Sequence, residues 1–286
     1  DMEGSRGLGD VYKRQINCLR IRLCTREAQA MEFSNEMGKL QRAMAASSAG
    51  ISRRQAMMNG LNLASGDSVL DIGCGGGHLL EEMAKSVGPT GRVFGLDPSA
   101  DQIAQARERC SAHTNVELLE SFANAIAIND NACDAIASTQ TLEYIDNVDE
   151  TLAEITRILK PAGTLANISI LWDHFKFHGA EDALNMRIFD AFRAHCFHQM
   201  LPMELPGKLK SLGFRHVQHK PLAFVVTNRD DNSPANYTEK VMANFALKQG
   251  IPESDVADWI NQLQQAEQEG RFGFTSFPVL TVAYLG

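Results

Sequence analysis

The stretch Asp71-Ile72-Gly73-Cys74-Gly75-Gly76-Gly77 lies between a short apolar run and an amphipathic one, and it decides the fold. The preceding run, Ser68–Ile72, is apolar and β-branched, as expected of a buried strand. The following run, His78–Val87, repeats its apolar residues on one face of a helix. Glycines between a strand and a helix let the backbone turn tightly and approach a ligand closely. We therefore expect a ligand-binding turn at the carboxyl end of this strand.

The alternation of apolar runs and helical patterns continues along the chain. Strands separated by helices of this length indicate βαβ units and a parallel sheet, and right-handed crossovers place the helices on both faces. We therefore expect an α/β fold, a Rossmann-like doubly wound, mostly parallel sheet of seven strands. The further strands are predicted at Arg92–Leu96, Val116–Glu120, Ala135–Thr139, Thr164–Leu171, His216–Thr227 and Phe277–Leu285, and the intervening helices at Asp101–Cys110 and Val148–Leu159.

The glycine spacing distinguishes two classes of nucleotide ligand. Dinucleotide-binding turns follow G-x-G-x-x-G, whereas here the third position is His78 when counted from Gly73 and Leu80 when counted from Gly75. The carboxylate of Asp71 would repel a pyrophosphate but suits a ligand that carries an ammonium group. The pattern therefore favours S-adenosylmethionine, whose sulfur is also positively charged.

Asp97 supports a nucleoside ligand, because it ends the second predicted strand 20 residues after Gly77. A carboxylate at this place can accept hydrogen bonds from ribose hydroxyls. Four segments, VLDIGCGGGHLLEEMA, GRVFGLDPSADQIAQAR, ACDAIASTQTLEYIDN and ITRILKPAGTL, together resemble successive motifs of the class I S-adenosylmethionine-dependent methyltransferases. The resemblance covers about Gly66–Leu171, and Gly213–Phe214 with the terminal strand fits the end of that family's fold, in which the last strand is antiparallel.

The resemblance implies a set of cofactor contacts. It places one group of residues around the methionine part, a second beside the ribose and adenosine, and a third facing the methionine part and the transfer site. These groups are Asp71, Gly73, Cys74 (through its backbone), Gly75 and Gly77; Asp97, Pro98, Gln102, Ser121, Phe122 and Ala123; and Thr139 and Gln140.

One position departs from the family pattern. After the third strand the family often has an acidic residue followed by alanine, which binds the adenine amine. Here the segment is Glu120-Ser121-Phe122-Ala123, so Phe122 occupies the acidic position. We expect adenine to rest against Phe122 and to bond to the backbone.

After Leu171 the alternation ends, and residues 172–206 and 228–275 are predicted to form a helical lid over the carboxyl edge of the sheet. The lid begins with Trp172-Asp173-His174-Phe175-Lys176-Phe177-His178, directly after the fifth strand. Histidines titrate near neutral pH and can accept a proton, so His178, His174 and Asp173 are the candidate catalytic residues. Trp172, Phe175 and Phe274 are the candidate substrate-binding residues, with an ordinary lid core as the alternative.

No metal site is predicted. His195 and His198 are three residues apart on a predicted helix but lack a third ligand at a telling spacing, and the six cysteines include no CxxC pair. Arg53 and Arg54 precede the sheet, where they could bind the cofactor carboxylate or form a solvated helix face.

Composition restricts the class of partner. The chain has 286 residues, 44% of them apolar and 22% charged, with a net charge of −8, as in ordinary globular proteins. This charge disfavours nucleic acid, no apolar run is long enough for a membrane span, and scattered cysteines are typical of a cytoplasmic protein.

The domain boundaries and partners follow from the same observations. Residues 1–30 lack hydrophobic periodicity and are expected to be a low-information or artefactual tail, with an ordered dimerisation arm as the alternative. Residues 31–286 are expected to form one methyltransferase domain. A homodimer of the protein is a further expectation.

The expected function is methyl transfer to the O, N, C or S atom of a small molecule. A non-catalytic methyltransferase-like binding protein and a nicotinamide-dependent dehydrogenase are the alternatives, the latter disfavoured by His78.

Overall fold

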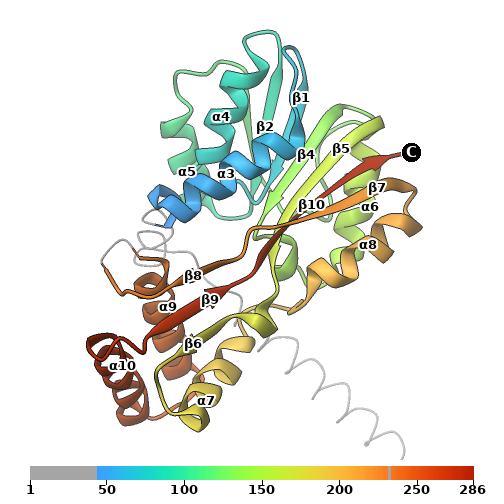
Figure 1. Cartoon of the computed structure of the whole chain (residues 1–286). Helices are drawn as coiled ribbons and strands as arrows, with labels where there is room; N and C mark the ends of the chain where they lie inside the picture. Colours follow the sequence, from blue (N-terminus) through green and yellow to red (C-terminus); the bar gives the residue numbers. More distant parts are fainter. Residues whose placement is uncertain (1–43, 231–232) are drawn as a thin grey trace, which may run out of the picture. The chain divides into compact units, whose positions relative to one another are not determined.

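The structure, a computed structural model, describes residues 44–230 and 233–286, and a seven-stranded sheet carries its fold (Figure 1). The strand order is β3-β2-β1-β4-β5-β10-β7. Strands β1 to β5 pair in parallel, whereas β10 runs antiparallel to both β5 and β7. This order confirms the predicted fold class. The bounds are β1 Ser68–Ile72, β2 Arg92–Asp97, β3 Val116–Glu120, β4 Cys133–Thr139, β5 Leu159–Ile170, β7 Phe214–Pro221 and β10 Pro278–Leu285.

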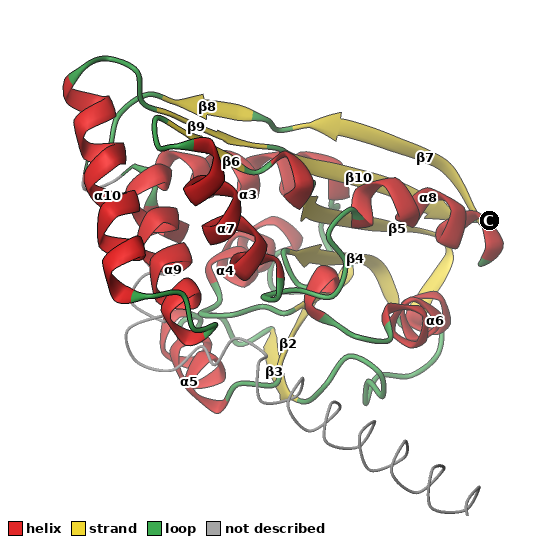
Figure 2. Cartoon of the chain, turned by 90° about the horizontal axis from the view of Figure 1, so that it is seen from below, coloured by secondary structure: helices red, strands yellow, loops and turns green. Residues whose placement is uncertain are grey.

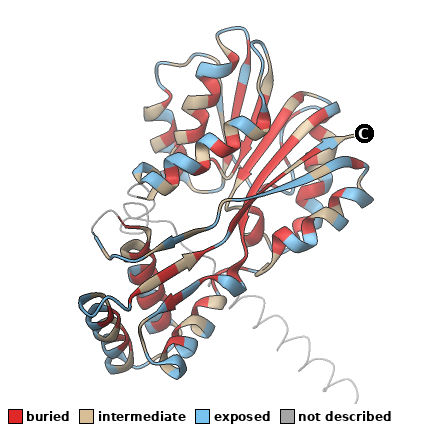
Figure 3. Ribbon diagram, in the orientation of Figure 1, coloured by how far each residue is buried: buried red, intermediate tan, exposed pale blue. Residues whose placement is uncertain are grey.

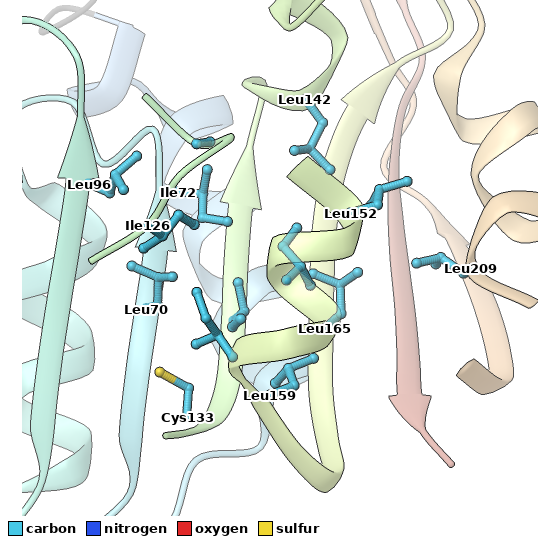
Figure 4. Close-up of a cluster of buried hydrophobic side chains, with 14 of the residues drawn as sticks. Leu70, Ile72, Leu96, Ile126, Cys133, Leu142, Leu152, Leu159, Leu165 and Leu209 are labelled. Carbon is cyan, nitrogen blue, oxygen red and sulfur yellow. The ribbon is translucent and has the colours of Figure 1, made fainter. Parts of the chain in front are cut away.

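Helices cover both faces of the sheet, and each face has its own hydrophobic core (Figure 2). One core contains α3 (Ser48–Leu61), α4 (His78–Val87) and α5 (Ala100–Arg109). The opposite core contains α6 (Val148–Ile158) and α8 (Leu201–Ser211), and its side chains are drawn in Figure 4. Because strand side chains alternate between faces, Val69 belongs to the first core and Leu70 to the second. Both cores consist largely of side chains without solvent contact.

The lid contains strands as well as helices, which differs from the helical lid predicted. Its helices are α7 (Asp182–Arg193), α9 (Pro234–Lys248) and α10 (Glu253–Gln268), and single-turn helices η1 (Leu142–Tyr144) and η2 (Trp172–His174) lie near its base. A three-stranded antiparallel sheet accompanies them. Its order is β6 (Lys176–His178), β9 (Gly273–Ser276) and β8 (Phe224–Val226).

Two predicted strands are divided between the sheets. The strand predicted at 216–227 is β7 followed by β8, and the terminal strand is preceded by β9. The chain changes sheets at Leu222 and Phe277, whose backbone groups bond to Pro278 and Leu171. Buried residues continue from the large sheet into this second sheet (Figure 3). The expected tail at residues 1–30 lies outside the described residues.

Candidate functional site: the glycine turn and the lid

Three of the four glycines of the turn serve different steric purposes. Gly73, Gly75 and Gly77 all have positive φ angles, of 73°, 51° and 79°, which L side chains rarely adopt. A Cβ atom at Gly73 would lie 2.0 Å from Oγ1 of Thr141, and one at Gly77 would lie 2.9 Å from Cα of Ala106. At Gly75 the nearest atom would be 3.8 Å away. Gly73 and Gly77 thus permit close packing, while Gly75 leaves space for a ligand.

Asp97 fixes the turn to the end of β2. Its Oδ2 accepts a hydrogen bond from the backbone N–H of Gly75 at 3.0 Å, and its Oδ1 accepts one from Ser99 at 2.9 Å. Burial raises the pKa of the Asp97 carboxyl, while these two backbone hydrogen bonds act in the opposite direction. Each carboxylate oxygen has a second lone pair. Asp97 can therefore hold the turn and still accept a hydroxyl donor from a ligand.

Asp71 is a buried carboxyl without full hydrogen-bond satisfaction. It is 3% exposed, and its Oδ1 has no hydrogen-bond partner among the described residues. Burial, with a smaller contribution from the charge of Asp97, raises the pKa of Asp71 to about 8. A buried acid of this kind would be stabilised in its charged form by a cation placed beside it. The site therefore fits the ammonium group of S-adenosylmethionine.

Cys74 lies within the same turn. The thiol is buried, and burial raises its pKa far above the ordinary value, with the nearby carboxyl of Asp71 adding to the effect. Because the thiolate is the nucleophilic form, burial disfavours reaction of this thiol near neutral pH. Its backbone N–H donates to the carbonyl of Leu96 at 3.0 Å, and a backbone contact of Cys74 with the cofactor stays a prediction.

The predicted adenine side lies where β2 and β3 end together. Asp97 is paired in register with Glu120, and the N–H of Ser121 donates to the carbonyl of Asp97 at 3.3 Å. The next side chain, Phe122, is 72% exposed, whereas Ala123 is buried. Pro98 is exposed and Gln102 is buried. The ring of Phe122 thus has a free face, and its contact with adenine stays a prediction.

Gln140 connects the end of β4 to α3. It has a φ of 50°, and its N–H donates to Ile168 at 2.7 Å. Its Oε1 accepts a hydrogen bond from Nη1 of Arg53 in α3. The interpretation of Arg53 as part of a solvated face is wrong, because this residue is only 8% exposed. Its neighbour Arg54 instead forms an ion pair with Glu82 at 2.6 Å.

The three predicted catalytic side chains are exposed in the lid. Asp173 forms an ion pair of 2.6 Å with Arg193, and the ring of His174 lies 5.8 Å from that of Phe277. His178 ends β6, opposite Gly273. No hydrogen bond within residues 44–230 and 233–286 links any of the three to the glycine turn. A catalytic role for them stays a prediction.

The predicted substrate-binding aromatics lie in the interior of the lid. Trp172, Phe175 and Phe274 are 4%, 6% and 1% exposed. The Trp172 and Phe175 rings are 4.9 Å apart, as are the Phe175 and Phe274 rings. In this arrangement they pack the lid, which is the alternative that the sequence left open.

The sequence interpretation missed Glu143 and Tyr144, which follow β4. Glu143 is fully buried, its Oε2 accepts a hydrogen bond from Ser169 Oγ at 2.8 Å, and burial raises its pKa to about 7. The ring of Tyr144 lies 5.8 Å from that of His195. Their position after the fourth strand was the available signal, since strand carboxyl ends carry function in such sheets.

His195 is a buried imidazole with one hydrogen-bonded ring nitrogen. Its Nδ1 lies 2.6 Å from the carbonyl oxygen of Phe192, which can only accept, so Nδ1 carries the proton. Its Nε2 has no partner among the described residues, and burial lowers its pKa to about 4. No cluster of three or more metal-binding side chains occurs in the described part of the chain.

Comparison with known proteins agrees with this geometry. Residues 69–163 match the family model described as a methyltransferase domain. Demethylmenaquinone methyltransferase of Staphylococcus aureus is 31% identical over 110 residues, which cover 38% of this chain and 46% of the relative. The matched segment therefore spans less than half of that relative.

Solved structures extend the similarity beyond the matched segment. The YcgJ protein of Bacillus subtilis has a TM-score of 0.58 and 16% identity, covering 82% of this chain and 98% of that chain. Phosphoethanolamine N-methyltransferase 2 of Haemonchus contortus, solved with S-adenosyl-L-methionine, has a TM-score of 0.55 and 19% identity, covering 82% and 52%. Within the described residues, no helix has the length and apolar character needed to cross a membrane. The sheet order, the glycine turn and these similarities identify residues 69–163 as a methyltransferase domain within the fold of the class I S-adenosylmethionine-dependent methyltransferases.

Proposed function

We propose that this protein transfers the methyl group of S-adenosylmethionine to a small-molecule acceptor and releases S-adenosylhomocysteine. The observation that carries the proposal is the pair of carboxyls at the glycine turn, of which Asp71 is buried and Asp97 half-buried. Asp71 has an unsatisfied oxygen, and Asp97 holds the N–H of Gly75. The bound cofactor would supply an electrophilic methyl group on a positively charged sulfur.

The residues of this chain would divide the binding between them. Gly75 leaves open space beside the turn, Asp71 would face the ammonium group, and Asp97 would accept ribose hydroxyls. Phe122 would cover one face of the adenine ring. Alignment of the reacting atoms is worth up to about 7–11 kcal/mol in well-oriented systems, so positioning by Gln140 and the lid would supply most of the rate.

A small acceptor in the cytoplasm is favoured over a macromolecule. The net charge of −8 opposes binding to nucleic acid, and the lid elements α7 and α9 pack against each other beside the carboxyl edge of the sheet. We further propose that residues 31–286 act as one domain, alone or as a homodimer. Sedimentation equilibrium distinguishes the two states.

Calorimetry with S-adenosylhomocysteine, S-adenosylmethionine and NAD tests the proposal. We expect both sulfur nucleotides to bind and NAD not to bind. Asp97→Ala should weaken binding by about 1–3 kcal/mol, since it removes buried hydrogen bonds to a charged acceptor. The exposed carboxylate of Asp190 provides the matched control, Asp190→Ala. Unchanged affinity in Asp97→Ala would refute the site.

Turnover separates the enzyme from its alternatives. Formation of S-adenosylhomocysteine in a screen of small metabolites would support the enzyme. Tight binding without turnover on any acceptor class would favour a non-catalytic binding protein. Binding of NAD alone would favour a dehydrogenase.

A further inference from the structure

Arg53 is a buried cation without an ionic partner. It lies in α3 and is 8% exposed, and no carboxylate of the described residues forms an ion pair with it. Nη1 donates to Gln140, and Nε has no hydrogen-bond partner within the described ranges. Burying an uncompensated charge is costly, and such groups are normally paired. The guanidinium is therefore incompletely satisfied by the described protein alone.

Glu143 favours the charged guanidinium of Arg53 through space but forms no ion pair or hydrogen bond with it. The electrostatic neighbours of Arg53 are Tyr144, Tyr237 and Glu143. Both oxygens of Glu143 are directed to other donors, with Oε2 bonded to Ser169 at 2.8 Å and Oε1 facing the N–H of Ile170 at 3.4 Å. The two tyrosines are partly buried phenols, which can donate hydrogen bonds to an anion but carry no charge near neutral pH.

Arg53 lies at the boundary between the sheet and the lid. It is fixed to Gln140, the first residue after β4, while Tyr237 belongs to the lid helix α9. The glycine turn is not among its hydrogen-bond partners in the described chain. If the methionine part lies along the glycine turn and Gln140 faces the transfer site, as proposed, an acceptor would reach the methyl group from this boundary.

We propose that Arg53, flanked by the hydroxyls of Tyr144 and Tyr237, binds a carboxylate of the methyl acceptor. A guanidinium presents a planar fork of donors that matches a carboxylate in two parallel hydrogen bonds. This assignment rests on the proposed function and restricts its acceptors to small organic acids. Arg53 is thus a substrate-binding residue, and it takes no part in the proton transfer.

A paired screen tests the assignment. Small hydroxy acids and amino acids are offered both as free acids and as their primary amides, with S-adenosylhomocysteine formation as the readout. We expect turnover with a free acid and at least a tenfold lower kcat/KM with its amide. In Arg53→Gln the KM for the acid should rise at least tenfold, so that acid and amide become nearly equivalent. Arg54→Gln is the matched control, because Arg54 pairs with Glu82 instead.

The same variants decide whether the carboxylate comes from the cofactor. Calorimetry should give the same S-adenosylhomocysteine affinity in Arg53→Gln as in the unmodified protein. A loss of tenfold or more, absent when decarboxylated S-adenosylmethionine is the probe, would assign Arg53 to the cofactor and overturn the proposal. Equal turnover of acids and amides by the unmodified protein would overturn it as well.

A stability measurement keeps the proposal testable if no acceptor is found. Replacing a buried, unpaired charge by an apolar side chain of similar length is often stabilising. Arg53→Met should therefore unfold at a higher urea concentration than the unmodified protein, and benzoate should stabilise the unmodified protein but not Arg53→Met. A lower midpoint for Arg53→Met would show that Arg53 has a structural partner and would overturn the proposal. Failure of the unmodified protein to bind S-adenosylhomocysteine would instead refute the methyltransferase function, and with it the identification of the carboxylate as that of a methyl acceptor, while benzoate binding would still report the anion site at Arg53.

Discussion

Replacing Asp71 with asparagine should stabilise the ligand-free protein while weakening cofactor binding. Burial raises the pKa of Asp71 from 3.8 to about 8, while in the unfolded chain it keeps its ordinary value. Below about pH 4 both states hold the proton, so this group then makes its full contribution to stability. As the pH rises towards 8 the unfolded state loses the proton but the folded state retains it, and the contribution is progressively lost.

The size of the effect follows from this pKa difference. Each pKa unit corresponds to about 1.4 kcal/mol, so roughly three units between the ordinary value and pH 7 amount to about 4 kcal/mol. The asparagine side chain of the variant does not titrate, so it carries no such penalty. The free energy of unfolding of Asp71→Asn should therefore exceed that of the unmodified protein by up to about 4 kcal/mol at pH 7, with almost no difference at pH 4.

Urea denaturation at several pH values between 4 and 8 measures this difference. The exposed residue Asp190 supplies the control, since Asp190→Asn should show no comparable pH-dependent gain. S-adenosylhomocysteine binding should fall at least tenfold in Asp71→Asn, because the ammonium group loses its carboxylate. A variant that is less stable than the unmodified protein at pH 7, or whose advantage does not vary with pH, would refute the reasoning.

Three further substitutions test other parts of the site. Gly77→Ala should destabilise the protein by about 2–4 kcal/mol in urea denaturation. The new Cβ would lie 2.9 Å from Cα of Ala106, and residue 77 has a φ of 79°. Gly207→Ala is the control and should be neutral or stabilising, because a Cβ there meets nothing within 4 Å. Phe122→Ala should weaken S-adenosylhomocysteine binding by about 0.5–1.5 kcal/mol, the contribution of an aromatic contact. The stability of the protein should not change, because the Phe122 side chain is 72% exposed. Equal affinity of the variant and the unmodified protein would exclude the adenine contact. His178→Gln should reduce kcat about 10²-fold or more if His178 is the general base, and normal turnover at saturating acceptor and pH 7 would remove it from the mechanism.

The part of the molecule that the sequence predicts well is the part with strong periodic signals. Strands β1 to β5 combine apolar runs with turn residues, and parallel pairing leaves few arrangements for them. The turn at Gly73 to Gly77 was recognisable because glycines are required where φ is positive. Asp97 could be located because it ends the second predicted strand 20 residues after Gly77.

The lid was predicted less well for a physical reason. Strands β6, β8 and β9 are three or four residues long, which is too short for a periodic pattern to distinguish them from loops. Arg53 was equally difficult, because the apolar residues of α3 do not form a continuous face, so that no pattern marks an arginine as buried. Its burial depends on Gln140, 87 residues away in the sequence.

The passage of the chain between the two sheets restricts how an acceptor can enter. Three strands of the large sheet, β5, β7 and β10, continue almost directly into β6, β8 and β9, and hydrogen bonds from Leu171 to Phe277 and from Leu222 to Pro278 link these crossings. An outward rotation of the second sheet would bend the backbone at all three crossings at once. Displacement of α7 relative to that sheet breaks the buried hydrogen bond from Asn185 Nδ2 to the carbonyl of Phe177 but bends no strand. We therefore expect the acceptor to enter and leave by displacement of α7 and α9, while β6, β8 and β9 keep their positions.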